Sequence, residues 1–176
     1  MGTGARRGVF LDRDGVIVDA ILRNGRAYAA LDLDHFKITD GAAEAVKRLA
    51  EAGFAIVVVT NQPEIARGTL SLATLNAMHA SLRAAMPIDE IVFCPHLDED
   101  GCTCRKPKPG MLCGAAARLG IDLASSFMVG DLWRDVEAGH AAGCRTILIE
   151  RPYSKCETAD ARVSTVSEAA NIIFGR

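Results

Sequence analysis

The sequence predicts an α/β fold of three layers, in which helices cover both faces of a parallel β-sheet. Short apolar runs with strand character alternate with segments of helical periodicity along the chain. The run at residues 54–59 is apolar at every position, which is typical of a strand in the middle of a parallel sheet. Because the 176 residues contain no linker or repeat, we expect one domain over residues 1–176.

The expected strands are short apolar runs bounded by glycine or polar residues. In chain order they occupy residues 9–11, 54–59, 91–93, 127–131 and 146–149. Residues 16–40 are expected to form an irregular loop over the end of the first strand, with Asn24-Gly25 as a turn. This loop is too short to fold as a separate lid domain, so the site beneath it should be open to solvent.

The expected helices have apolar residues at helical spacing and carry start or stop signals. They occupy residues 42–50, 70–85, 111–119, 136–142 and 166–174. Gly53 follows the first helix, and Ser71 is a suitable N-cap for the second. Pro109-Gly110 opens the third helix, and Gly143 ends the fourth. Because strands and helices alternate, the strands should be joined by crossovers and run parallel.

The composition excludes several classes of partner. Lys and Arg number 20 against 22 Asp and Glu, so no strong positive field favours nucleic acid or a membrane surface. The N-terminal residues 1–7 lack the apolar segment of a secretory signal, and no apolar stretch is long enough to span a bilayer. We therefore expect a cytoplasmic protein that binds neither nucleic acid nor a membrane, and we also expect a monomer.

Carboxylates follow two of the expected strands. Asp12 and Asp14 come after the first strand, whereas Asp131 and Asp135 come at and after the fourth. The ends of parallel strands meet at one edge of a sheet, where gathered carboxylates repel one another unless a cation neutralises them. Oxygen ligands suit Mg²⁺, so the sequence predicts a magnesium site. The alternative, a pair of turn-forming aspartates before Gly15, does not account for the second strand end.

Other polar groups indicate the kind of reaction in which such a metal would take part. Thr60 and Asn61 close the second strand with hydroxyl and amide donors, and Arg105-Lys106 supplies cations. Together with the carboxylates these groups describe a phosphoryl-transfer site. The sequence lacks a Gly-x-x-x-x-Gly-Lys loop, which argues against a nucleoside-triphosphate motor and favours a carboxylate nucleophile.

A second metal site is predicted within eleven residues. Cys94, His96, Cys102 and Cys104 supply the number and type of ligands of a closed zinc site. Four protein ligands leave no position for a reactive water, so this zinc should be structural and should hold the loop 94–104. The alternative is a set of buried thiols with a surface histidine.

The chain resembles the haloacid dehalogenase (HAD) superfamily of phosphatases over nearly its whole length. Asp12-Arg13-Asp14-Gly15 is similar to its first motif, Thr60 to its second, Lys106 to its third, and Gly130-Asp131 with Asp135 to its fourth. The resemblance implies a Rossmann-like HAD fold with a minimal cap and an aspartyl-phosphate intermediate.

The same resemblance implies roles for these residues. Asp12 would be the nucleophile and Asp14 the general acid and base, with Mg²⁺ on Asp12, the backbone carbonyl of Asp14, and Asp131. Thr60 and Lys106 would bind the phosphoryl oxygens. Asp135 would support Lys106 or a metal-bound water.

Within the superfamily, in its subfamily IIIA, two groups of phosphatases share the zinc loop. Asn61-Gln62 with Ile65-Ala66-Arg67-Gly68, and Cys94-Pro95-His96 with Cys104-Arg105-Lys106-Pro107, are similar to the D-glycero-D-manno-heptose-1,7-bisphosphate 7-phosphatases. The compact spacing of the zinc loop is more similar to that of the histidinol-phosphate phosphatases. Asn61, Gln62, Arg67 and Arg105 are the expected substrate-binding residues. We expect the heptose bisphosphate as substrate. The alternative substrates are histidinol phosphate and a different sugar phosphate. The alternative function is that of a scaffold that binds phosphorylated ligands without turnover.

The chain departs from the heptose group at three places. Pro63-Glu64 replaces the usual Ser-Gly, Leu132 stands where a lysine follows the motif aspartate, and residues 19–35 do not match the substrate loop. The resemblance implies that a lysine at position 132 would face the second phosphate, and this chain lacks that cation.

Overall fold

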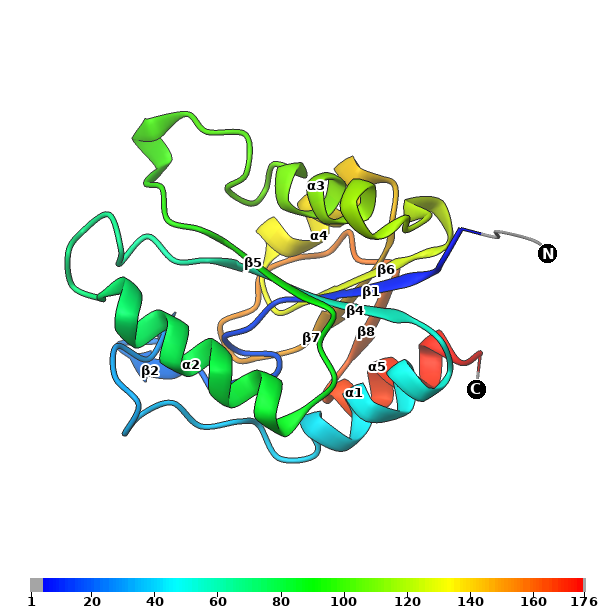
Figure 1. Cartoon of the computed structure of the whole chain (residues 1–176), viewed down its shortest axis with the longest axis horizontal. Helices are drawn as coiled ribbons and strands as arrows, with labels where there is room; N and C mark the ends of the chain where they lie inside the picture. The colour runs from blue at the N-terminus through cyan, green and yellow to red at the C-terminus, as the bar shows by residue number, and fades with distance from the viewer. Residues whose placement is uncertain (1–4, 176) are drawn as a thin grey trace.

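A computed structural model describes residues 5–175. Residues 1–4 belong to the segment in which we expected no secretory signal, and they lie outside the described residues, as does residue 176. Its main feature is a six-stranded parallel sheet in the order β5-β4-β1-β6-β7-β8 (Figure 1). The strands of this sheet are β1 (Gly8–Leu11), β4 (Ala55–Asn61), β5 (Glu90–Cys94), β6 (Phe127–Gly130), β7 (Arg145–Ile149) and β8 (Ala161–Val163). The predicted parallel sheet is confirmed.

Helices cover both faces of the sheet. The helices are α1 (Ala42–Glu51), α2 (Leu72–Ala85), α3 (Gly110–Leu119), α4 (Trp133–Ala142) and α5 (Val166–Ile173), with 3₁₀ turns at Asp98–Asp100 and Leu123–Ser125. Figure 1 shows α3 and α4 on one side of the sheet and α1, α2 and α5 on the other. The three-layer prediction is therefore confirmed, and the expected helix positions agree with the observed ones to within three residues. Among the described residues, no helix has the length and apolar character needed to cross a membrane.

Strand β4 shows why the run at residues 54–59 is apolar at every position. Ile56 and Val58 belong to the buried cluster beneath α1 and α5, whereas Val57 and Val59 belong to the cluster beneath α3. Successive side chains of a strand point to opposite faces, so a strand between two helical layers buries all of them. The last residue, Asn61, is only partly buried because it lies at the edge where the site forms.

The topology brings three strand ends together. Strand β1 lies between β4 and β6, and the chain leaves β1 toward β4 on one side and leaves β6 toward β7 on the other. Ligands of open α/β sheets bind where such connections diverge, at the carboxyl ends of the strands. Asp12 follows β1, Thr60 lies at the end of β4 and Asp131 follows β6, so the strand order places these predicted site residues at the expected edge.

Two expectations from the sequence were wrong. Residues 16–40 are not irregular throughout, because β2 (Ile21–Arg23) and β3 (Arg26–Tyr28) form an antiparallel hairpin. Asn24 and Gly25 have φ angles of 50° and 73°, the left-handed conformation that two-residue hairpin turns require. Strand β8 was not among the five expected strands; it has only three residues and pairs on one side, with β7.

The Ser71 cap of α2 is confirmed. Its side chain accepts a hydrogen bond from the Thr74 backbone N–H at 3.0 Å, which satisfies one of the free donors of the first turn.

Candidate active site

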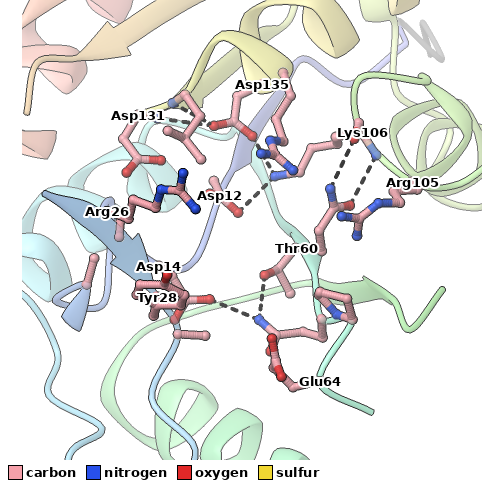
Figure 2. Close-up of a pocket in the computed structure, with 18 of the residues that line it drawn as sticks. Asp12, Asp14, Arg26, Tyr28, Thr60, Glu64, Arg105, Lys106, Asp131 and Asp135 are labelled. Carbon is pink, nitrogen blue, oxygen red and sulfur yellow. Dashed lines mark hydrogen bonds and ion pairs between the residues drawn. The ribbon is translucent and has the colours of Figure 1, made fainter. Parts of the chain in front are cut away.

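A pocket of about 400 Å³ opens beyond the carboxyl ends of β1, β4 and β6 (Figure 2). Its walls come from these strand ends, the β2-β3 hairpin, the segment after β4, the loop after β5 and the start of α4. The polar residues that line it include Asp12, Asp14, Arg26, Tyr28, Thr60, Asn61, Gln62, Glu64, Arg67, Arg105, Lys106, Asp131, Arg134 and Asp135. All the residues predicted for catalysis and substrate binding are among them.

Three carboxylates form a buried cluster at the base of the pocket. Asp12 follows β1, Asp131 follows β6, and Asp135 lies in the first turn of α4, with one carboxylate oxygen from each within 4.8 Å of the others. Each residue is at most 7% exposed. Asp135 Oδ2 accepts the backbone N–H groups of Asp131 and Leu132 at 3.2 and 3.0 Å, so it also fixes the start of α4.

Lys106 brings one positive charge into this cluster. Its Nζ lies 2.8 Å from Asp12 Oδ1 and 2.6 Å from Asp135 Oδ1, and it donates to the Val59 carbonyl at 2.8 Å. Burial opposes the charge on Lys106, but the neighbouring carboxylates Asp12 and Asp135 together raise its pKa above the ordinary lysine value. Lys106 is therefore a permanently charged ammonium group that bridges Asp12 and Asp135.

The cluster fits a divalent cation. Three ionised carboxylates and one ammonium would leave two negative charges in a buried site. Burial, followed by repulsion from Asp135 and Asp14, outweighs the attraction of Lys106 and raises the pKa of Asp12 from 3.8 to about 7. Burial also raises the pKa of Asp131, whose Oδ1 is buried without a hydrogen-bond partner. A hard cation would neutralise the excess charge and supply that partner.

Asp14 does not join the acidic cluster through its carboxylate. The carboxylate pairs with Arg13, and its Oδ2 accepts a hydrogen bond from Gln62 Nε2 at 2.9 Å. The same Gln62 nitrogen donates to Thr60 Oγ1 at 2.9 Å (Figure 2). The nucleophile candidate and the acid-base candidate thus have separate environments, and the predicted metal contact of Asp14 is limited to its backbone carbonyl.

The other predicted substrate-binding residues differ in how free their side chains are. The amide of Asn61 forms two hydrogen bonds of 3.1 Å with the backbone of Lys106, so it holds the Lys106 segment against β4. Arg105 is paired with Asp98 at 2.5 Å and donates to the His96 carbonyl, and Arg67 is paired with Glu64 at 2.5 Å. Asn61 is therefore better placed to position Lys106 than to contact a substrate.

Several residues of the site were not predicted. Arg26 and Tyr28 reach the pocket from the hairpin that was expected to be loop, and Arg134 reaches it from α4. Tyr153, after β7, donates to Asp131 Oδ2 at 2.6 Å. The rule that sites form after parallel strands could have indicated Tyr153, because it lies just beyond a predicted strand.

The four predicted zinc ligands come together beside the pocket. Cys94 Sγ lies 3.7 Å from Cys102 Sγ and 3.2 Å from Cys104 Sγ, and His96 Nδ1 lies 3.3 Å from Cys104 Sγ. The edge of a tetrahedral site with Zn–S bonds of 2.3 Å is about 3.8 Å. The donor types and their spacing therefore fit a closed tetrahedral metal site, and the Arg105 backbone N–H donates to Cys102 Sγ as an additional support.

Comparison with known proteins decides the family. A family model described as HAD-hydrolase-like matches residues 103–168. The D-glycero-β-D-manno-heptose-1,7-bisphosphate 7-phosphatase of Pseudomonas aeruginosa is 41% identical over 150 residues, which cover 81% of this chain and 80% of that protein. The chain belongs to the HAD-like phosphatases. The Escherichia coli protein of the same name is 38% identical over 156 residues, which cover 81% of this chain and 78% of that protein.

A solved structure of a HAD-like phosphatase has the same fold. The D,D-heptose 1,7-bisphosphate phosphatase of B. bronchiseptica, complexed with magnesium and phosphate, superposes with a TM-score of 0.84. It is 32% identical, and the match covers 96% of this chain and 98% of that one. The predicted superfamily and its Rossmann-like fold are confirmed.

The charge of the acidic cluster predicts a pH-dependent stability. Between pH 3.8 and about 7, the metal-free folded protein keeps a proton on Asp12 that the unfolded chain releases. The stability that Asp12 contributes is therefore complete below pH 3.8 and lost as the pH rises toward 7. We expect the melting temperature of Asp12→Asn relative to wild type, measured in EDTA, to rise across this range.

Magnesium should reverse this trend in the wild-type protein. Because the cation binds ionised carboxylates, the increase in melting temperature on adding Mg²⁺ should grow with pH and be much smaller in Asp12→Asn. The comparison with Asp12→Asn removes contributions from other groups such as His79, whose pKa is lowered to about 4 by burial and by Arg13. A difference between the two proteins that is constant with pH would contradict the assignment of charge.

Proposed function

We propose that this chain is a Mg²⁺-dependent phosphomonoester hydrolase that removes the phosphate at C7 of D-glycero-D-manno-heptose 1,7-bisphosphate through an aspartyl-phosphate. The observation that carries the chemistry is the buried Asp12 carboxylate, held by Lys106 at 2.8 Å and facing a pocket at the sheet edge. The heptose substrate is supported by the names of relatives that are about 40% identical over most of their length.

The proposed reaction has two steps. Asp12 attacks the phosphorus, the ester P–O bond breaks, and Asp14 gives its proton to the departing alkoxide. Asp14 then takes a proton from water, which attacks the aspartyl-phosphate and restores the Asp12 carboxylate. Thr60 and Lys106 donate to the phosphoryl oxygens throughout.

Two metals complete the proposed enzyme. Asp12, Asp131 and the backbone carbonyl of Asp14 would hold Mg²⁺, which when bound supplies positive charge to the transferred phosphoryl group. Asp135 keeps Lys106 in place through its 2.6 Å ion pair. Zinc at Cys94, His96, Cys102 and Cys104 would have no open position and would fix the loop that carries Lys106.

The rim of the pocket offers cations for a second phosphate. Arg26, Arg67, Arg105 and Arg134 line it, and Arg67 and Arg105 are already paired with Glu64 and Asp98. Among the described residues, Arg26 and Arg134 have no ion-pair partner, and the Nε of Arg134 is buried without a hydrogen bond. These two arginines are the proposed contacts of the C1 phosphate, in place of the lysine that is absent at Leu132.

The remaining expectations stay predictions. These are a single domain over residues 1–176, a cytoplasmic location, a monomer, and a small phosphorylated metabolite as ligand with no nucleic acid or membrane partner.

The proposed activity is tested by phosphate release with Mg²⁺. We expect the wild-type protein to have a higher kcat/KM on the heptose bisphosphate than on histidinol phosphate or other sugar phosphates, with both anomers tried. Asp12→Asn should lose at least ~1,000-fold in kcat while folding normally, because the nucleophile is removed. Turnover retained in Asp12→Asn would contradict the covalent mechanism, and a preference for histidinol phosphate would reassign the substrate.

Replacing either of the rim arginines Arg26 and Arg134 should raise KM for a bisphosphate but not for a monophosphate. Arg26→Met or Arg134→Met should raise KM for the bisphosphate by about 10-fold, because a charge-assisted contact contributes roughly 1.5–3 kcal/mol, while kcat changes little. KM for a monophosphate should stay the same. Arg23→Met is the matched control, since Arg23 pairs with Arg26 in the hairpin but does not line the pocket. An equal rise in KM for both kinds of substrate would exclude a second phosphate site here.

Removal of zinc should lower both the stability and the activity of the protein. We expect about one zinc per chain by elemental analysis, and Cys102→Ser should lower the zinc content and the melting temperature. The kcat should also fall, because the loop carries Lys106. Cys113→Ser is the control, because Cys113 is exposed and outside the cluster. Full stability and activity in zinc-free protein would show that the cluster is not a structural metal site.

A further inference from the structure

Arg13 has the largest fully buried side chain of the core, yet it carries a charge next to the candidate nucleophile. We propose that Arg13 is a positioning residue, which holds the Asp14 carboxylate where it can transfer a proton to the leaving group and from water. The inference rests on the proposed function, since it assigns a role within the same reaction.

The contacts of Arg13 define a fork around Asp14. Nε donates to Asp14 Oδ2 and Nη2 donates to Asp14 Oδ1, both at 3.1 Å, so the guanidinium fixes both oxygens of the carboxylate. Gln62 binds Oδ2 from the other side at 2.9 Å. With three donors on its two oxygens, the carboxylate has a defined orientation on the pocket wall.

The remaining surface of Arg13 is also occupied. Its Nη1 lies 3.4 Å from His79 Nε2 on α2, and its guanidinium lies 5.4 Å from the centre of the Phe36 ring. Burial, followed by the charge of Arg13, lowers the pKa of His79 to about 4, so His79 is neutral at pH 7 and can accept this hydrogen bond. Helix α2 and the segment after the hairpin therefore anchor the guanidinium, which in turn anchors Asp14.

The burial of Arg13 makes this arrangement rigid. Its side chain is 0% exposed, and Asp14 is the only carboxylate paired with it among residues 5–175. An unpaired guanidinium in this position would be strongly destabilising, because several kcal/mol of hydration are lost on burial. Movement of Asp14 away from Arg13 is therefore penalised, whereas an exposed arginine would impose no such constraint.

The backbone turn explains how neighbouring residues can form this pair. The Arg13 carbonyl accepts hydrogen bonds from the N–H groups of Val16, Ile17 and Val18 at 2.9 to 3.3 Å, so the chain turns sharply after β1. Gly15 allows the turn with a φ of 87°, and a Cβ there would lie 2.0 Å from Asp131. In an extended strand, residues 13 and 14 would point to opposite faces. The turn instead lets both side chains meet outside the acidic cluster.

The proposed role concerns the proton and therefore depends on the leaving group. When an alkyl ester is cleaved, the electron pair of the broken P–O bond leaves with an oxygen that needs the proton of Asp14. A 4-nitrophenolate leaves as a stable anion and does not need it. The second step, in which Asp14 takes a proton from water, is common to both esters.

Pre-steady-state kinetics of Arg13→Met test this role. With 4-nitrophenyl phosphate, we expect a burst of about one nitrophenolate per active site and then turnover slowed by roughly 100-fold, because Asp12 is phosphorylated but hydrolysis lacks a positioned base. With the heptose bisphosphate, we expect no burst and a loss of roughly 100-fold or more. Asp14→Asn should give the same pattern, with about one aspartyl-phosphate per chain detected by mass spectrometry.

Two further variants keep the test decisive. Arg13→Lys preserves the charge but not the fork, and should show the same pattern with a loss of about 10-fold even if Arg13→Met does not fold. Arg48→Met is the matched control, because Arg48 also contacts a ring, that of Phe174 at 5.3 Å, but lies on α1 away from the pocket. It should leave both esters unaffected.

The outcomes separate the inference from the proposed function. If the Arg13 variants hydrolysed both esters more slowly by the same factor and gave no burst, the positioning role would be overturned. An active wild-type protein would still uphold the proposed function. A wild-type protein that released no phosphate from any ester would overturn the proposed function itself.

Discussion

The site depends on one buried ammonium group among three buried carboxylates. Lys106 contacts Asp12, Asp135 and the Val59 carbonyl at once, and so links the loop after β5 to β1, α4 and β4. Because the lysine alone does not neutralise the cluster, the same geometry creates the demand for a divalent cation. The side-chain amide of Asn61 binds the backbone N–H and carbonyl of Lys106, and the Cys/His cluster gathers the part of the loop that precedes Lys106. The contacts of Lys106 therefore determine both the stability of the loop and the charge of the site.

The fold was predictable because the local and global signals agree. Residues 55–59 of β4 are all apolar and are buried on both faces, and α2 begins after its predicted cap at Ser71. The hairpin was missed for the opposite reason. Its strands have three residues each and expose Leu22 and Tyr28, so neither burial nor periodicity marks them, and only the Asn24-Gly25 turn does.

The membership of the site was predictable, but the partners of each side chain were not. Strand ends in a parallel sheet must converge, so Asp12, Thr60 and Asp131 were found from the sequence. The contact of Asp14 with its neighbour Arg13 depends on a local turn of the backbone. The contact of Asn61 with the Lys106 backbone depends on packing between segments that are 45 residues apart. Motif spacing contains no information on those contacts.

The small hairpin has a consequence for how ligands come and go. Its two strands pair with each other and not with the main sheet, and they form one wall of a pocket whose other walls belong to the body of the fold. Within residues 5–175, no separate folded unit covers the pocket above Asp12. Because the pocket opens at the surface of this structure, small molecules can enter and leave it by diffusion. Discrimination between metabolites falls on equilibrium contacts with the rim, such as those of Arg26, instead of on a closing motion.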